Sequence, residues 1–426
     1  MNKIRIILPA AIASLFITLI IIGTFIKVND TPIPTSDSGF RVALSLGQDI
    51  HQSIENGVQF KIDDTLISSE KELQKAYIEK GATEMYVRIA TKRYDDNDSK
   101  EDPYHGKIHN LEVALKHCKL AAELGIPINP ELMCAYTYMD GFTSQAPDFK
   151  EYPEIKTPDK PWSEYTLDEM CDVLEQYGAL VAKEILDTGC TVEYWNLGNE
   201  ANYGFAGVAL GLETNVNPDL KNKSMYDLYT MDHIGADFLK ENVWNYNAKM
   251  MMALEKGIRS VQKDAKFSTH VSCQNDVYFN TTYYSTLLEE GLNLDQAGIS
   301  VYPTSEFAKF YPDYMGDMKR VIQGIYETTG LPVFIAEYAY PSENMNGEFG
   351  NWDTPVKGYS LSDEDQAAFT KDFILWCKDN HVSGIRFWGP DVLGDWTPMS
   401  FYSYDGEQKI ATAKPVMDII TNAVSD

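Results

Sequence analysis

The sequence of 426 residues is poor in cysteine, in basic residues and in internal repeats. Its six cysteines are scattered and none forms a C-x-x-C pair, so a zinc ribbon or a redox motif is not supported. The 36 basic residues are outnumbered by 63 acidic ones, which gives a formal net charge of −27. A surface this negative repels phosphate backbones, so we expect no nucleic acid partner. A neutral polysaccharide is not excluded by this charge.

Aromatic residues, in contrast, are abundant and make up 12% of the chain, with 26 Tyr and 7 Trp. Aromatic faces are surfaces on which sugar rings stack. Hydrophobic residues make up 44% and charged residues 23%, which is an ordinary globular mixture. This composition excludes a mainly disordered chain, a collagen-like chain and a polytopic membrane protein.

A long apolar run lies near the N-terminus, where Ile7 to Ile26 forms 20 uncharged residues preceded by Lys3 and Arg5. Twenty helical residues at about 1.5 Å each span a bilayer core of about 30 Å. The run ends in a poor cleavage site for a signal peptidase. We therefore expect residues 1–27 to be an uncleaved membrane anchor that places the remainder outside the cell. The alternative, a cleaved signal, predicts a secreted protein. Residues 28–39 are expected to be a linker.

From residue 40 to residue 426, short apolar runs alternate with longer amphipathic segments, a pattern typical of β/α units around a parallel sheet. Eight strands and eight helices are expected, so the sequence predicts a (β/α)8 TIM barrel, an α/β fold. The expected strands cover residues 41–46, 84–89, 128–133, 192–197, 266–270, 297–302, 333–337 and 384–388. The expected helices cover residues 70–80, 110–124, 167–188, 246–264, 283–290, 314–329, 363–380 and 413–423.

Long loops follow the third, fourth and seventh expected strands, at residues 134–165, 201–243 and 338–362. In a β/α barrel these loops lie at the C-terminal face, where active sites are built. We therefore expect them to shape a substrate groove.

Two of the expected strands lead into a glutamate, Glu200 after the fourth and Glu337 at the end of the seventh. In a barrel both emerge at the same face. Glycoside hydrolysis needs two such carboxyl groups, one protonated to serve the leaving oxygen and one ionised to attack the anomeric carbon. A single glutamate at a strand end often caps a helix or pairs with a lysine. Two of them in aromatic surroundings favour the catalytic interpretation.

Other residues at the same face strengthen this interpretation. They supply a cation, hydrogen-bonding groups and a flat apolar floor, and they are Arg88, His270, Tyr302 and Trp388 on the second, fifth, sixth and eighth strands. Taken alone, His270 is better interpreted as a core histidine with satisfied hydrogen bonds.

These motifs resemble those of clan A glycoside hydrolases, which are retaining enzymes built on the (β/α)8 barrel. The matching residues are Arg88, Asn199-Glu200, Tyr302, Glu337 and Trp388. Within the clan, the chain is most similar to the endo-β-1,4-galactanases of glycoside hydrolase family 53. That similarity lies in Gly198-Asn199-Glu200, Val301-Tyr302-Pro303 and Glu337-Tyr338-Ala339-Tyr340-Pro341, where Tyr338 replaces the Thr of the family.

The resemblance implies a role for each matching residue. Glu200 would be the general acid and then the general base, and Glu337 the nucleophile. Asn199 would hydrogen-bond the sugar 2-hydroxyl. Tyr302 would orient Glu337, and Arg88 would keep Glu337 ionised. Trp388 would form the floor under the sugar. His270 would contact a carboxylate or the sugar. No metal and no cofactor is expected.

The sequence therefore predicts an extracellular, membrane-anchored retaining endo-β-glycosidase that hydrolyses a polysaccharide as a monomer. The candidate substrate is β-1,4-galactan or a related β-glycan. Two alternatives stay open. One is a glycanase that trims the exopolysaccharide of its own cell, which an anchor would suit. The other is a barrel that binds glycan without cleaving it, against which the two glutamates argue.

Overall fold

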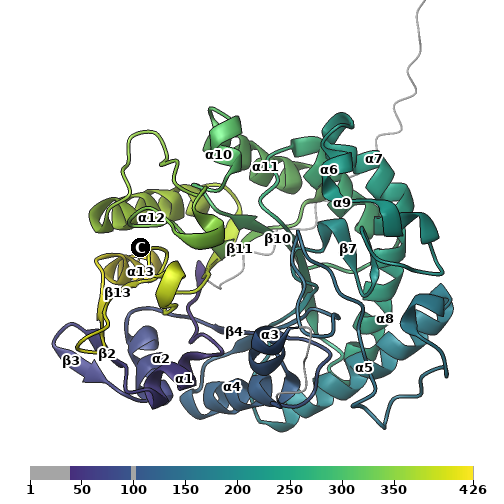
Figure 1. Ribbon diagram of the computed structural model, residues 1–426, viewed down its shortest axis with the longest axis horizontal. Helices are drawn as coiled ribbons and strands as arrows, with labels where there is room; N and C mark the ends of the chain where they lie inside the picture. Colours follow the sequence, from purple (N-terminus) through teal and green to yellow (C-terminus); the bar gives the residue numbers. More distant parts are fainter. Residues whose placement is uncertain (1–38, 97–101, 426) are drawn as a thin grey trace, which may run out of the picture. The chain divides into compact units, whose positions relative to one another are not determined.

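Eight parallel strands lie at the centre of the computed structural model, which describes residues 39–96 and 102–425 (Figure 1). The expected anchor and almost all of the expected linker lie outside these residues. Within the described residues, no helix is long and apolar enough to cross a membrane.

The strands form one sheet in the order β1-β12-β11-β10-β9-β6-β5-β4, and a parallel bridge between Ala43 and Glu84 joins its two ends. This closed order confirms the predicted (β/α)8 barrel, and each predicted strand is present with ends shifted by about three residues or fewer. Six-residue runs such as Val333–Tyr338 are buried throughout, as expected of strands covered on both faces. The strands are β1 (Arg41–Ala43), β4 (Met85–Ile89), β5 (Ile128–Leu132), β6 (Tyr194–Leu197), β9 (Lys266–Val271), β10 (Gln296–Val301), β11 (Val333–Tyr338) and β12 (Val382–Phe387).

The predicted helices surround this barrel. Side-chain caps define several helix starts; Thr166, for example, forms a reciprocal capping box with Glu169 at the start of the longest helix. The helices are α2 (Glu70–Glu79), α4 (Leu111–Leu124), α5 (Leu167–Asp187), α8 (Asn245–Val261), α9 (Val277–Glu289), α11 (Tyr314–Thr329), α12 (Asp363–Lys378) and α13 (Val416–Ser425).

Two helix starts differ from the prediction. The α9 helix begins at Val277 rather than at residue 283, because the side chain of Asp276 accepts a hydrogen bond from the N–H of Phe279 and caps the helix there. The α13 helix begins at Val416 rather than at residue 413, because the preceding residues form a strand.

That strand belongs to a second, four-stranded sheet that the sequence did not predict. Its order is β13-β14-β2-β3, and β14 pairs in parallel with β2 although the two are far apart in the chain. Its strands are short and partly exposed, so they lack the continuous apolar signal of the barrel strands. They are β2 (Gln59–Ile62), β3 (Thr65–Ile67), β13 (Tyr402–Asp405) and β14 (Ile410–Ala413).

The connections that follow the barrel strands carry short elements of their own. After Glu200 come one turn of 3-10 helix (Ala201–Tyr203) and then a two-stranded hairpin, β7 (Gly204–Phe205) and β8 (Val208–Ala209). The short helices are α1 (Ile50–Glu55), α3 (Pro103–Ile108), α6 (Met225–Leu228), α7 (Ala236–Leu239) and α10 (Phe307–Phe310).

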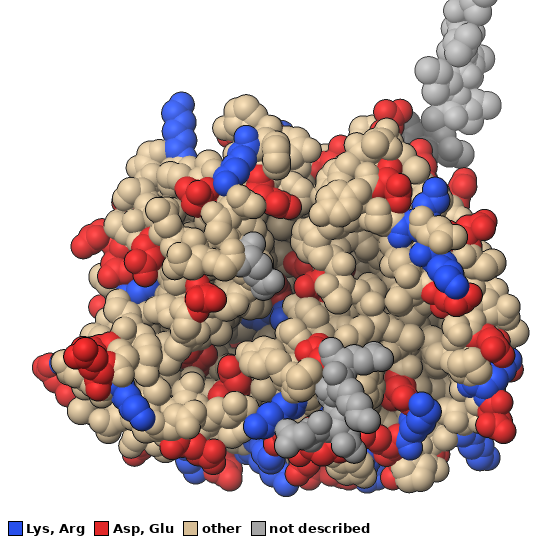
Figure 2. Space-filling view, in the orientation of Figure 1, with Lys and Arg blue, Asp and Glu red and all other residues tan. Residues whose placement is uncertain are grey.

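The distribution of charge reflects the acidic composition. Acidic side chains are spread over the face shown in Figure 2, with basic side chains between them and uncharged residues over much of the remaining surface. Such a face favours a neutral ligand over a polyanion.

Candidate active site

Glu200 lies just beyond β6, in a turn where its backbone adopts a strained conformation. Its φ of 48° is in the left-handed region, which non-glycine residues seldom adopt and which is common at functional sites. The side chain is only 7% exposed. One carboxyl oxygen, Oε2, accepts a hydrogen bond of 3.0 Å from the N–H of Gly141, in the loop after β5. The carboxyl group is therefore held in a defined place.

The surroundings of Glu200 favour its protonated form. Burial, followed by the negative charge of Asp140, raises the pKa of Glu200 to about 7, while the Gly141 hydrogen bond and the charge of Arg88 act in the opposite direction. A carboxyl group with this pKa still carries a proton in a large share of molecules near neutral pH. It can therefore donate a proton to a leaving group.

Glu337, at the end of β11, has the opposite environment. Its Oε2 accepts a hydrogen bond of 2.6 Å from the hydroxyl of Tyr302, and its Oε1 pairs with the guanidinium groups of Arg88 and Arg386, the second at 3.2 Å. Two cations and one hydroxyl donor stabilise the ionised carboxylate. The two glutamates therefore differ in the state that their surroundings favour, which is the arrangement that acid and nucleophile roles require.

Arg88 and Asn199 connect the two glutamates. Besides pairing with Glu337, Arg88 donates through Nη2 to Oδ1 of Asn199 at 3.0 Å, and Asn199 directly precedes Glu200. The side-chain amide of Asn199 donates to the backbone oxygen of Met139 at 2.6 Å. The structure thus brings together four of the predicted residues, namely Arg88, Asn199, Glu200 and Glu337.

His270, on β9, supports the backbone of Glu200. Its Nε2 accepts a hydrogen bond of 3.2 Å from the N–H of Glu200. Burial lowers the pKa of His270 to about 3, so the ring is neutral and the accepting Nε2 leaves the proton on Nδ1. That nitrogen faces Oε2 of Glu131 at 3.6 Å. His270 thus lies against one carboxylate, but that carboxylate is Glu131 rather than a predicted catalytic group.

An aromatic wall borders Glu337. Trp388 is half-buried at the end of β12, and its ring lies 6.4 Å from that of Tyr302 and 4.6 Å from that of Trp396. Trp352, from the loop after β11, approaches Tyr302 with a ring separation of 5.0 Å. These rings offer apolar faces beside the carboxylate, as expected for the floor of a sugar site.

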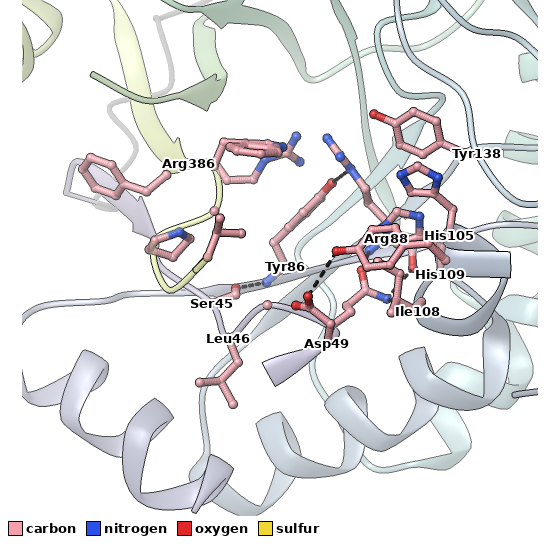
Figure 3. A pocket seen from close by; sticks show the side chains of 18 residues that line it. Ser45, Leu46, Asp49, Tyr86, Arg88, His105, Ile108, His109, Tyr138 and Arg386 are labelled. Carbon is pink, nitrogen blue, oxygen red and sulfur yellow. Dashed lines mark hydrogen bonds between the residues drawn. The ribbon is translucent and has the colours of Figure 1, made fainter. Parts of the chain in front are cut away.

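A pocket of about 150 Å³ opens beside these residues, between the segment after β1, the α3 helix and the segment after β12. Figure 3 shows Tyr86, Arg88 and Arg386 reaching into it from their strands, with His105 and Tyr138 on the other side. Trp388 also lines it. Neither glutamate lines this pocket, but Arg88 and Arg386 line it and both pair with Glu337, so the pocket adjoins the site.

Comparison with known proteins assigns the family. The profile of glycosyl hydrolase family 53 matches residues 46–416. The chain belongs to glycosyl hydrolase family 53. It is therefore a glycoside hydrolase, as the sequence motifs predicted.

The relatives of this family 53 hydrolase are distant. A protein of Aspergillus oryzae described as a probable arabinogalactan endo-β-1,4-galactanase A is 22% identical over 240 residues. That alignment covers 56% of this chain and only 60% of the relative.

Two solved structures share the fold over most of the chain. The family 53 catalytic domain of Ignisphaera aggregans gives a TM-score of 0.65 at 17% identity, covering 91% of this chain and 97% of the other. A structure from a study of two fungal β-1,4-galactanases gives a TM-score of 0.64 at 16% identity, covering 90% of this chain and 99% of the other.

Sequence analysis missed two charged residues of this hydrolase. Glu131 on β5 is fully buried, and Arg386 on β12 is 4% exposed. Each is the one charged residue that interrupts its largely buried strand, and a charged residue in a buried strand is rarely found without a partner. A single charged residue within a predicted buried strand is therefore the sequence feature that could have identified Glu131 and Arg386.

Proposed function

We propose that this family 53 hydrolase is a retaining endo-β-glycosidase that cleaves β-1,4-galactan or a closely related β-glycan. Glu200 serves as the general acid and base, and Glu337 serves as the nucleophile. The observation that supports these roles best is the contrast between the two buried carboxyl groups. One has a pKa raised to about 7, and the other is paired with two guanidinium groups.

The first step forms a glycosyl-enzyme. A carboxylate oxygen of Glu337 attacks the anomeric carbon while the bond to the leaving oxygen breaks, and Glu200 gives its proton to that oxygen. Tyr302 holds the attacking carboxylate through its 2.6 Å hydrogen bond. Glu200 is then ionised, which readies it to act as a base.

The second step hydrolyses this ester. Glu200 takes a proton from a water molecule, whose oxygen attacks the anomeric carbon. The bond to Glu337 breaks and its electron pair returns to the carboxylate, beside Arg88 and Arg386. Two inversions restore the original β configuration.

The choice of substrate is supported by the relatives and by the surface. The Aspergillus oryzae relative and one of the similar structures are described as β-1,4-galactanases. A neutral galactan avoids the repulsion that an acidic protein exerts on a polyanion. The half-buried Trp388 and its aromatic neighbours offer a stacking surface for a sugar ring.

The proposed test uses β-1,4-galactan, β-glucan, β-mannan and xylan as substrates, and includes the exopolysaccharide of the source cell. Proton NMR of the fresh products shows the anomeric configuration before mutarotation. We expect release of β-configured oligosaccharides from galactan. Products that first appear as α anomers would exclude the retaining mechanism. Binding of every polysaccharide without any product would favour the glycan-binding alternative.

We also propose that the run from Ile7 to Ile26 anchors the enzyme, with the barrel outside the cell. The apolar length and the preceding basic residues support this. Protease treatment of intact cells that express the full chain should digest the barrel and leave a membrane-bound fragment. Recovery of the intact chain in the culture medium would instead indicate secretion.

The pH dependence of activity follows from the pKa of Glu200. The acid must be protonated, so kcat/KM should fall as the pH rises through about 7. Asp140→Asn removes a negative charge that raises this pKa, so the alkaline limb should move to lower pH. The amide oxygen can still accept from the N–H groups of Phe142 and Thr143, as the carboxylate does at 2.7 and 2.6 Å. A pH–rate profile measures this shift.

The matched control is Asp148→Asn in the same loop, where the carboxylate accepts from the N–H of Lys150 at 3.0 Å. We expect its alkaline limb to coincide with that of the wild type. An unchanged limb in the Asp140 variant would show that Asp140 does not tune the acid.

A further inference from the structure

Four buried charged residues form a cluster of alternating positive and negative charge that includes the proposed nucleophile, Glu337. Arg88 and Arg386 each contact both Glu131 and Glu337. On the side of Glu131, the distances are 3.0 Å to Nε of Arg88 and 3.1 Å to Nη1 of Arg386. All four side chains are at least nine-tenths buried. The formal charges of two arginines and two glutamates cancel.

Tyr86, on β4, completes the support of this cluster. Its hydroxyl donates to Oε1 of Glu131 at 2.8 Å and accepts from Nε of Arg88 at 2.6 Å. The guanidinium carbon of Arg386 lies 3.6 Å from the centre of the Tyr86 ring, which is a close cation–π contact. Arg386 is thus held on one face by an aromatic ring and at its edge by two carboxylates.

We propose that Arg386, anchored by Glu131, is a positioning residue that drives the second step, the release of the sugar from Glu337. This inference rests on the proposed function, because it assigns a role relative to the nucleophile. Arg386 acts through Glu337 and needs no contact with the sugar.

The net charge of the cluster changes during the reaction. In the free enzyme the four charges sum to zero. When Glu337 becomes an ester it is neutral, and the two arginines face the single negative charge of Glu131. Cleavage of the ester restores the missing negative charge at the position that Arg88 and Arg386 contact. A cation placed where negative charge develops stabilises that transition state.

The ion pair between Arg386 and Glu337 acts differently on the first step, the formation of the ester. There the carboxylate loses charge as it bonds to carbon, so Arg386 does not assist the attack. Removing Arg386 should therefore slow ester hydrolysis more than ester formation. Arg88 is a less specific probe of this effect, because it also holds Asn199 beside Glu200.

The experiment is pre-steady-state kinetics of Arg386→Met with 2,4-dinitrophenyl β-1,4-galactobioside, whose leaving group needs no acid. We expect a burst of dinitrophenol close to one equivalent per enzyme and a steady-state kcat about 10- to 100-fold lower. The KM should fall with kcat because the intermediate accumulates. Intact-mass spectrometry should detect the glycosyl-enzyme, and Arg386→Lys should restore part of kcat.

The control is Arg41→Met. Arg41 is also buried and pairs with Glu84 at 3.2 Å, but it lies on β1 among residues that do not line the pocket. It should lose thermal stability without a burst. If Arg386→Met shows no burst, or slows both steps alike, the inference is wrong.

The proposed function is tested separately with the wild type. A 2-fluoro analogue of the same glycoside should label Glu337. Absence of that label would overturn the nucleophile assignment. A labelled wild type together with an Arg386 variant that accumulates no intermediate would overturn only the role of Arg386.

Discussion

Glu337→Ala should lower kcat for galactan hydrolysis by about 10⁴-fold or more, the largest effect that we expect from any single substitution. The change removes the proposed nucleophile, the carboxylate that Tyr302, Arg88 and Arg386 hold in place. Reducing-sugar release from galactan measures the loss. Added azide should restore turnover of an aryl β-galactobioside and give the α-glycosyl azide, because azide then attacks directly from the vacated side.

A suitable control for this variant is Glu84→Ala. Glu84 is 1% exposed and pairs with Arg41 at 3.2 Å, just before β4 begins. Its loss leaves a buried guanidinium without its carboxylate and should destabilise the fold by about 3–5 kcal/mol. We expect kcat to persist in the folded fraction. Equal losses of kcat in both variants, measured on folded protein, would mean that Glu337 acts through the fold alone.

Glu200→Ala should lower galactan hydrolysis by about 10²- to 10⁴-fold, because the leaving sugar oxygen then departs without a proton. The first step with a 2,4-dinitrophenyl glycoside should change little, since that leaving group needs no proton. Azide should accelerate the second step and yield the β-glycosyl azide. The alkaline limb of the pH profile, which reports loss of the proton of Glu200, should disappear.

The two azide products distinguish the roles of the glutamates. If the roles were exchanged, the α azide would come from the Glu200 variant and the β azide from the Glu337 variant. If both alanine variants kept full activity, neither residue would be catalytic.

The sequence alone was sufficient to predict the barrel and to place Glu200 and Glu337 at one face of it. Barrel strands are buried on both faces, so they appear as continuous apolar runs whose order and ends can be recognised locally, as in Val333–Tyr338. Because parallel strands place their C-terminal ends at one face, the positions of Glu200 and Glu337 followed from the strand order.

Only the tertiary structure determined which groups surround each glutamate. Gly141 and Asp140 reach Glu200 from a different loop, and Arg386 reaches Glu337 from the neighbouring strand. The sheet that pairs β2 with β14 was hidden for the same reason, since its partners lie at opposite ends of the chain.

A pKa shift or a charge cluster depends on burial and on distances between residues far apart in sequence. Strand periodicity depends only on near neighbours. Local patterns therefore determined the fold and the positions of the two carboxyl groups, whereas the different surroundings of Glu200 and Glu337 arise only when the barrel closes.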